Sequence, residues 1–258
     1  MFQNTVRSVK YSASVATSEL PPRPRLPSRE ASRARRPARE RALSREAIAS
    51  AALAIVDRDG LDALTMRTVA QYMGTGAASL YAHVASKEDL LELVVERVIG
   101  ELEFPGEPDD EHWQELLKEW AHAVRAAFLR HRDLARASFA RVPLGENALR
   151  SSEWMIAVMR AGGLADQVIA YACDLLPLYV IAVCYEDSLY GSETSPEDIA
   201  KYVANMREYF ESLPRDRFPN MASLAGPLTA GAGDERFEFG LDVLVRGLAA
   251  MGLTEGRR

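Results

Sequence analysis

The feature that most constrains this chain is a series of short amphipathic segments that follow one another closely in its first hundred residues. Apolar residues recur with helical spacing between Ser44, a favourable N-cap, and Gly60, which ends the segment. A second helix is expected to begin at the cap residue Thr65 and to stop at Gly74 after about two turns. Helices this short cannot form a bundle of long helices. They predict a small, compact helical domain, called the head below.

Two more helices complete this head. A short one is expected through Ala78, Leu80, Tyr81 and Val84, and a longer one begins at a capping box made by Ser86 and Asp89. A short helix, a glycine turn and a second short helix are typical of the helix-turn-helix, whose second helix enters the major groove of DNA. We therefore expect a DNA-binding domain over residues 44–103.

The rest of the chain, residues 104–258, also shows helical periodicity. A break rich in proline and glycine separates it from the head, and a long apolar stripe begins at Trp113. No segment has the pattern of a strand, so the predicted fold class is all-α, and the segment from Pro214 to Gly233 is expected to be a flexible loop. Further helices are expected at about 133–141, 146–161, 165–190, 196–212 and 234–251.

Charge is distributed unevenly along the chain. Residues 1–45 hold eleven Lys or Arg and three Glu, although the net charge of the whole chain is −6. Residues 1–43 are rich in Pro, Arg and Ser and lack a sustained apolar period, which predicts a disordered arm. Two alternatives for this segment are a targeting sequence and an over-extended gene start. Nothing near the start has the apolar core of a secretory signal.

The basic arm can compensate for an acidic head. Residues 46–100 hold four basic and eight acidic residues, which is unusual for a domain that approaches DNA. We therefore hypothesise that arginines of the arm supply positive charge, for example in a minor groove; the alternative is a solvated terminus. The arginines concerned are Arg33, Arg35, Arg36, Arg39 and Arg41.

The most apolar stretch of the chain runs over residues 168–185. Its 18 residues reach the lower bound for a membrane span, but Asp174 and Pro177 interrupt it, and a charge in a bilayer is costly. A buried or interface helix is the better interpretation, and no membrane partner is expected. The two cysteines of the chain, Cys173 and Cys184, lie in this stretch, so a disulfide scaffold is not expected and a reducing compartment is.

The head closely resembles the DNA-binding domain of the tetracycline-repressor (TetR) family. The resemblance rests on Leu64–Gly74, on Ala78–Val84 and on Ser86–Leu91, and its most specific part is the run L-Y-x-H-V-x-S-K-x-x-L-L. It implies that Thr65 and Arg67 approach phosphates, with Arg67 also near a base edge. The residues implied to contact DNA are Thr65, Arg67, Thr75, Gly76, Ala77, Ala78, Ser79, Tyr81, His83 and Lys87.

The implied recognition helix is unusually small. Gly76, Ala77 and Ala78 carry no side chain able to make a paired hydrogen bond to a base, so modest direct base specificity is expected. The flanking Tyr81, His83 and Lys87 would bind phosphates and fix the register. The alternatives are that Tyr81 is a core residue, that His83 ends a helix, and that Lys87 is a solvated charge.

The resemblance also implies that the body binds a small molecule and forms a homodimer. We expect the helices at about 165–190 and 234–251 to form a four-helix bundle with a second subunit. The stripe of Leu241, Leu244, Val245 and Leu248 has the helical spacing for such an interface. The alternative is that both helices are buried within one subunit.

Large and adaptable side chains of the body are candidates for a ligand pocket, with core packing as the alternative for each. Asp174 is the most specific of them, because a buried carboxylate needs a partner; that partner is either an internal Arg or Tyr or a polar or cationic ligand. The candidates are Trp113, Trp120, Phe128, Trp154, Met155, Met159, Tyr171, Asp174 and Tyr179.

Other functional motifs are incomplete. The chain has no P-loop, no G-x-S-x-G elbow and no helical pair of histidines four residues apart, so neither catalytic residues, a cofactor nor a metal site is expected. The sequence thus predicts a cytoplasmic, nucleoid-associated dimeric regulator, a repressor released from a palindromic operator by a small molecule. Alternatives are an activator of the same fold, a helical protein-docking module and a helical enzyme.

Overall fold

The computed structural model describes residues 43–131, 133–138, 144–189, 195–231 and 233–251. The arm predicted at 1–43 lies outside this part except for Leu43, as do the last seven residues and the end of the helix expected at about 133–141. Every regular element within it is a helix, which confirms the all-α fold class. The elements are α1 (Arg45–Asp59), η2 (Leu61–Ala63), α2 (Met66–Tyr72), α3 (Ala77–Leu80), α4 (Lys87–Ile99), α5 (Trp113–Leu129), α6 (Leu134–Ser138), α7 (Glu146–Ala161), α8 (Asp166–Leu189), α9 (Pro196–Glu211), α10 (Pro219–Ser223), α11 (Ala225–Leu228) and α12 (Gly233–Met251).

The head consists of α1 to α4 around its own apolar core. Ile48 and Val56 of α1 and Leu80 of α3 are fully buried, and α1 packs against both α2 and α4. Ser44 caps α1 by accepting a hydrogen bond from the amide of Ala47 at 3.0 Å, as expected from the sequence. The short helices α2 and α3 are therefore held by burial rather than by their own helix propensity.

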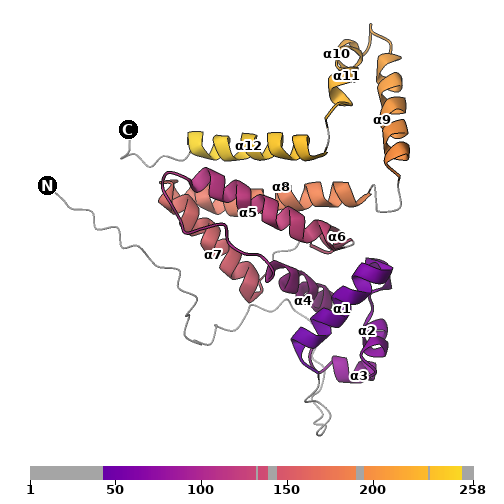
Figure 1. The fold of residues 1–258 in the computed structure, drawn as a ribbon, viewed down its shortest axis with the longest axis vertical. Helices are drawn as coiled ribbons and strands as arrows, with labels where there is room; N and C mark the ends of the chain where they lie inside the picture. Colours follow the sequence, from indigo (N-terminus) through magenta and orange to yellow (C-terminus); the bar gives the residue numbers. More distant parts are fainter. Residues whose placement is uncertain (1–42, 132, 139–143, 190–194, 232, 252–258) are drawn as a thin grey trace, which may run out of the picture.

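Helix α4 belongs to both parts of the molecule. It packs against α1 in the head and against α5, α6 and α7 in the body (Figure 1). Its apolar residues Leu90, Val94 and Val98 are fully buried along the whole length of the helix. Helix α4 is therefore shared by the core of the head and the core of the body.

The core of the body lies between α5, α7 and α8, and α12 covers α5 and α8. At one end of this core, α7 and α5 approach so closely that a Cβ on Gly162 would lie 2.5 Å from the indole ring of Trp113. Arg125 of α5 fastens the start of α12, because its guanidinium lies 2.9 Å from Asp187 of α8 and 2.6 Å from Asp234. The two carboxylates raise the pKa of Arg125 even though burial opposes this shift.

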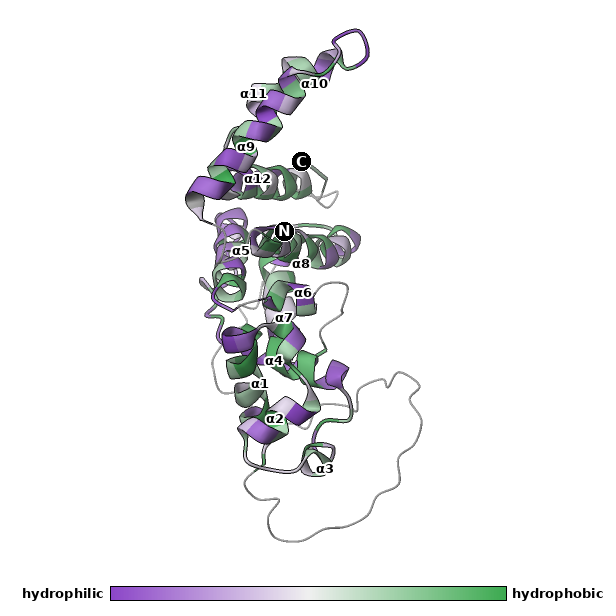
Figure 2. Ribbon diagram, turned by 90° about the vertical axis from the view of Figure 1, so that its right-hand side faces the viewer, coloured by the Kyte–Doolittle hydropathy of each residue, from purple (hydrophilic) through white to green (hydrophobic). Residues whose placement is uncertain are grey.

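Helix α8 exposes much of its apolar surface. Within the described residues it is the one helix with the length and hydropathy of a membrane-crossing segment, and 28% of its most apolar window is buried. Figure 2 shows α8 largely in the green of apolar residues. Its inner face, with Ile169, Leu176 and Val180, packs on the body, whereas Leu175 and Leu178 on the other face are 42% and 47% exposed.

Helices α9, α10 and α11 form a helical extension that projects from the body (Figure 1). The loop predicted at 214–233 in fact contains the two short helices α10 and α11, which pack back on α9. Pro219 is tolerated there because it occupies the first turn of α10, where no helical partner is needed for its nitrogen. None of the described side chains of α9 is buried.

Candidate nucleic-acid interface and ligand-binding body

The start of α2 is fixed by a capping box. Thr65 accepts a hydrogen bond from the amide of Thr68 at 3.0 Å, and the Thr68 hydroxyl accepts one from the amide of Thr65 at 2.9 Å. The sequence prediction identified Thr65 as the cap but missed the part played by Thr68. This rigid first turn carries the exposed side chain of Arg67, one of the residues predicted to contact DNA.

The turn between α2 and α3 depends on Gly74. Its φ of +64° lies in the left-handed region, and the amide of Thr75 then donates to the carbonyl oxygen of Ala70 at 2.9 Å. A Cβ on Gly74 would meet no atom within 4 Å, so backbone conformation and not space demands glycine here. The result is the sharp turn of a helix-turn-helix.

The recognition helix α3 is a single turn anchored by Leu80, which is fully buried. The sequence predicted a helix that continues to Val84, but residues 81–83 form a turn instead. Gly76 and Ala78 are exposed, while Thr75, Ala77 and Ser79 are half-buried. The outer edge of α3 is therefore narrow and nearly free of polar groups.

The flank of α3 carries polar side chains beside the N-terminus of α4. Tyr81 is 55% exposed, which excludes the alternative that it is a core residue, and Lys87 is exposed in the first turn of α4. The amides at the start of a helix attract anions. His83 is half-buried, and its Nε2 has no hydrogen-bond partner within the described residues.

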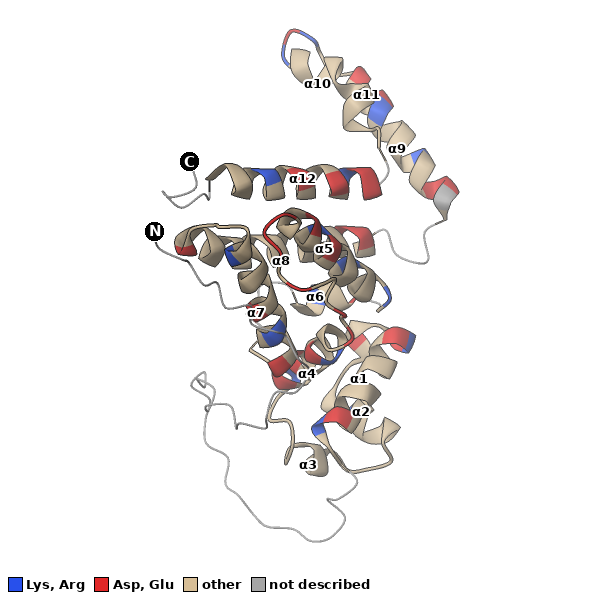
Figure 3. Cartoon of the chain, turned by 60° about the vertical axis from the view of Figure 1, so that its left-hand side comes forward, with Lys and Arg blue, Asp and Glu red and all other residues tan. Residues whose placement is uncertain are grey.

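Arg45 links the start of the described chain to this flank. Its Nη1 donates to the carbonyl oxygen of His83 at 2.7 Å. The chain that precedes α1 therefore joins the head directly beside the segment that carries Tyr81 and His83. Figure 3 shows acidic positions on α1 and α4 and none on α3. Two of them, Glu88 and Asp89, lie in the first turn of α4.

Six of the predicted pocket residues come together in the core of the body. Trp120 of α5 donates its Nε1 hydrogen to Ser151 Oγ at 2.9 Å, and Trp154 of α7 donates to the carbonyl oxygen of Gly106 at 2.8 Å. The polar ends of these two indoles are thus satisfied internally. The six buried residues are Trp113, Trp120, Phe128, Trp154, Met155 and Met159.

The other three predicted pocket residues lie on α8, outside this group. Tyr179 stacks on Phe237 of α12 with 5.7 Å between ring centres and donates to the Phe237 carbonyl oxygen at 2.9 Å, and burial raises the pKa of its hydroxyl. Tyr171 is 69% exposed, and Asp174 is exposed as well. The prediction that Asp174 is a buried carboxylate was wrong for the single chain, because this residue lies on the outer face of α8.

The apolar stripe predicted as an interface on α12 is also placed differently. Leu241, Val245 and Leu248 are buried against α5 and α8 within one subunit, and Leu244 is half-buried. The free face of α12 carries Phe239, which is 73% exposed. Periodicity identified the apolar side of α12 correctly but could not tell which helix covers it.

The sequence did not predict the hydrogen-bonded contact between α4 and α7, called the Glu96 joint below. The carboxylate of Glu96 accepts hydrogen bonds from the amides of Asn147 and Ala148, and the Asn147 side chain donates back to the Glu96 carbonyl oxygen at 3.1 Å. Helix α7 has no side-chain cap of its own, because Gly145 stands at that position. An uncapped helix start is the one sequence signal that could have indicated the missing partner.

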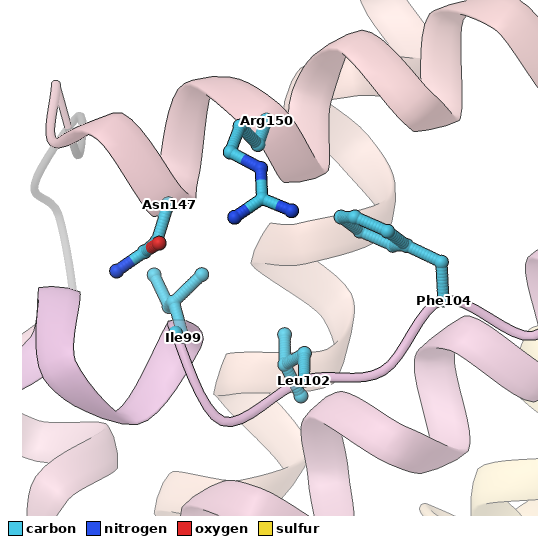
Figure 4. A pocket seen from close by; sticks show the side chains of 6 residues that line it. Ile99, Leu102, Phe104, Asn147 and Arg150 are labelled. Atoms are coloured by element: carbon cyan, nitrogen blue, oxygen red, sulfur yellow. The ribbon is translucent and has the colours of Figure 1, made fainter. Parts of the chain in front are cut away.

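A small hollow opens beside this joint. Figure 4 shows Asn147 and Arg150 of α7 facing Ile99 at the end of α4 and Leu102 and Phe104 of the segment that follows. Phe104 in turn stacks on Trp154 with 5.4 Å between ring centres. The hollow thus lies between the helix that carries the head and the aromatic core of the body.

Both the head and the body match known protein families. Residues 48–94 match the family model described as bacterial regulatory proteins, tetR family, and residues 104–252 match the tetracyclin repressor-like C-terminal domain. The HTH-type transcriptional repressor DrrR1 of Streptomyces coeruleorubidus is 32% identical over 213 residues, which are 81% of this chain and 78% of that protein. The tetracycline repressor protein class D from Escherichia coli is 27% identical over 206 residues, which are 80% of this chain and 88% of that protein.

The same fold is found in solved structures. ActR from Streptomyces coelicolor in complex with actinorhodin superposes with a TM-score of 0.75 and 43% sequence identity, over 81% of this chain and 97% of ActR. A helix-turn-helix head occurs on many unrelated proteins and would leave the family open. The body match alone spans more than half of the sequence, and this chain belongs to the TetR family of bacterial regulatory proteins.

Proposed function

We propose that this protein is a dimeric transcriptional repressor that binds a palindromic operator and is released by a small molecule. The observation that carries the proposal is the head itself, in which a glycine turn presents the exposed edge of α3 next to the N-terminus of α4. This arrangement suits insertion of α3 into a major groove with phosphates on either side.

The division of labour on the DNA follows from the chemistry of the exposed groups. Arg67, Tyr81 and Lys87, together with the first amides of α4, would bind phosphates and set the register. Thr75 and Ser79 carry the polar groups of the recognition edge, and the small Gly76, Ala77 and Ala78 would allow close contact with thymine methyl groups. Thr65 and His83 would complete the phosphate contacts on the two flanks.

The dimer would form through the outer faces of α8 and α12. These two helices are neighbours, and their free faces carry exposed apolar side chains that a single chain leaves in water: Tyr171, Leu175 and Leu178 on α8, and Phe239 and Val243 on α12. Large apolar side chains exposed on neighbouring helices are typical of an interface. A second copy suits it better than a bilayer does, because Asp174 lies in the middle of the α8 face.

The ligand would bind in the body, near the cluster of Trp and Met side chains between α5 and α7. Such side chains are adaptable and suit a large apolar molecule. ActR, which shares 43% identity, has been solved with actinorhodin and with (S)-DNPA, and we propose a ligand of similar kind here. Asp174 and Tyr171 lie on the outer face of α8, so the dimer interface suits them better than the pocket does.

Ligand binding would act on DNA through α4. This helix carries the head and is tied to α7 by Glu96, so a ligand that displaces α7 or α5 also moves the head. The ligand then favours a state in which the two heads no longer match the spacing of the operator, to the extent that it binds that state more tightly. The protein would act by binding rather than by catalysis, on DNA in the cytoplasm.

The test is selection of random duplex DNA by the purified full-length protein at two salt concentrations. We expect an enriched palindrome, with an affinity that falls steeply as salt rises. Lys87→Ala should weaken binding to every sequence and reduce the slope of log affinity against log salt by about 0.9. Ser79→Ala should instead change the preference at one base position.

A matched control is available on the helical extension formed by α9, α10 and α11. Lys201 is exposed on α9, so Lys201→Ala removes the same charge and should leave DNA binding unchanged. Failure to enrich any sequence, with a salt-independent background, would contradict the proposal and favour the protein-docking alternative. Reporter expression from the enriched palindrome would then separate a repressor from an activator.

A further inference from the structure

A guanidinium group with no carboxylate partner among the described residues lies beside the segment that follows the recognition helix. Arg45, the first residue of α1, is exposed, and its Nη1 donates to the carbonyl oxygen of His83 at 2.7 Å. His83 belongs to the short segment between α3 and α4 that also holds Tyr81, and Lys87 follows at the start of α4. The positive charge of Arg45 is thus held at the flank where phosphate contacts are proposed.

The acceptor that orients Arg45 is a neutral one. A guanidinium has five N–H donors, and the carbonyl oxygen of His83 accepts from one of its nitrogens. A carboxylate in that place would neutralise the charge, as it does for Arg58 at the other end of the same helix, whose Nη2 lies 2.6 Å from Asp59. Within the part of the chain that the structure describes, the contact with His83 therefore orients Arg45 but leaves its charge and its other donors available.

Acidic residues also lie near this flank. Glu46 follows Arg45 on α1, and Glu88 and Asp89 lie in the first turn of α4. The carboxylate of Asp89 is engaged by the chain itself, since it accepts a hydrogen bond from a backbone amide just before α4 at 3.1 Å. Lys87 alone would face three acidic residues, and Arg45 doubles the positive charge that an anion meets here.

We propose that Arg45 is a further DNA-contacting residue, which binds a backbone phosphate on the flank of the recognition helix. The inference rests on the proposed function, because it requires α3 to lie in a major groove. The planar guanidinium suits this role, since it can hold phosphate oxygens through two parallel hydrogen bonds while another N–H stays on the His83 carbonyl. Because that hydrogen bond fixes the side chain before DNA binds, little conformational freedom is lost on binding.

Three variants separate the charge of Arg45 from its hydrogen bond. Arg45→Gln keeps an N–H donor for the His83 carbonyl but removes the charge, so affinity for the enriched palindrome should fall about fivefold at low salt. The slope of log affinity against log salt should become shallower by about 0.9 for each phosphate contact that is lost. Arg45→Lys keeps the charge and should preserve the slope. Arg45→Ala should change the slope as much as Arg45→Gln does, which decides the question if one of the two variants fails to fold.

Arg58 supplies a matched control on the same helix. Arg58→Gln removes the same charge from an exposed side chain that is bound to Asp59, and it should leave both the affinity and the slope unchanged. If Arg45 were merely a link between α1 and the segment after α3, Arg45→Gln would bind DNA as the wild type does. An unchanged slope in Arg45→Gln, or an equal change in Arg58→Gln, overturns the proposal.

A scan of the operator locates the contact. Each phosphate of the palindrome is replaced in turn by an uncharged methylphosphonate, and affinity is measured for the wild-type protein and for Arg45→Gln. We expect a position at which the replacement weakens binding of the wild type about fivefold but does not weaken binding of Arg45→Gln, because both changes remove the same interaction. If no position shows this coupling, Arg45 does not contact a phosphate and the proposal is wrong.

Lys87→Ala separates a failure of this inference from a failure of the proposed function. If Lys87→Ala makes the slope shallower and Arg45→Gln does not, the protein binds DNA through this flank and only the contact by Arg45 is refuted. If the wild type enriches no DNA sequence, both the proposed function and the contact are refuted.

Discussion

The head and the body differ in how completely each buries its own helices. In the head, α1 buries seven of its 15 residues, and the short helices close around Leu64 and Leu80, which are fully buried. In the body, α8 is the longest and most apolar helix and yet buries five of its 24 residues. The body therefore has more apolar surface than one chain can cover, whereas the head does not.

This difference indicates that the body needs a second copy of the chain for its stability, whereas the head needs a partner, DNA, for its function. A head whose helices are covered within one chain presents polar and small groups to its ligand, DNA. A body with uncovered Leu175, Leu178 and Phe239 gains stability when a second copy removes these side chains from water, at about 25 cal/mol for each Å² buried. Substitutions in the two regions and at their junction should therefore have different effects.

The largest effect is expected on the open face of the body. Leu178→Glu places a charge in the proposed interface, so the protein should become monomeric and its affinity for the palindrome should fall by about 100-fold or more. Light scattering after size exclusion gives the mass, and a gel-shift titration gives the affinity. Leu149 on α7 is equally exposed, at 46% against 47%, so Leu149→Glu is the matched control and should remain dimeric.

A smaller effect is expected when the positive charge of the arm is removed from the head. Deleting residues 1–42 should lower operator affinity by about tenfold at low salt, and the salt dependence should become shallower by about 0.9 for each phosphate that the arm neutralises. Exchanging Arg33, Arg35, Arg36, Arg39 and Arg41 for Lys keeps the charge and should preserve the slope. An unchanged affinity and slope after deletion would mean that the arm is merely solvated.

At the junction of the two regions, Glu96→Gln should weaken the joint between α4 and α7. The amide oxygen can still accept one hydrogen bond, but the negative charge at the N-terminus of α7 is removed, which costs about 1 kcal/mol. Thermal unfolding should show a lower Tm by a few degrees. Glu103 is exposed just beyond α4, so Glu103→Gln removes the same charge and should leave the Tm unchanged.

Sequence reasoning worked where the information is local. The caps at Ser44, Thr65 and Ser86 and the turn at Gly74 depend on a few adjacent residues, and each was predicted at its position. The helix at 146–161 likewise matches α7, because Gly145 and Gly162 bound it on both sides.

Sequence reasoning failed where the answer depends on a distant helix. Asp174 lies on a helix that is apolar on almost every side and Leu241 on an amphipathic one, but in both helices the face that is covered depends on the packing of α5, α8 and α12. The contacts of Glu96 with Ala148 and of His131 with Asp57 each connect residues more than 50 positions apart along the chain, a separation at which periodicity carries no information. The DNA contacts and the ligand pocket remain predictions.

The smallest effect on stability at neutral pH is expected from Cys184→Ala, on the inner face of α8. This face is covered, in contrast to the exposed outer face of the same helix. Cys184 is 1% exposed, its Sγ lies 4.0 Å from the carbonyl oxygen of Arg125, and burial raises the pKa of its thiol to about 12. The unfolded thiol releases its proton with a pKa of about 8.5, so the folded state holds the proton more tightly. Stability should therefore be unaffected below that pH and decline above it, by at most about 1.4 kcal/mol per pH unit.

Urea unfolding of the wild-type protein and of Cys184→Ala at pH 7, 9 and 10 isolates this thiol, because every other titrating group is common to both. Cys184→Ala should be less stable at pH 7, since it leaves a small cavity, but the difference between the two proteins should shrink as pH rises. A difference that stays constant would mean that water reaches Cys184 as readily in the folded state as in the unfolded one. The inner face of α8 would then be as open as its outer face, and the contrast between a covered and an uncovered side of this helix would fail.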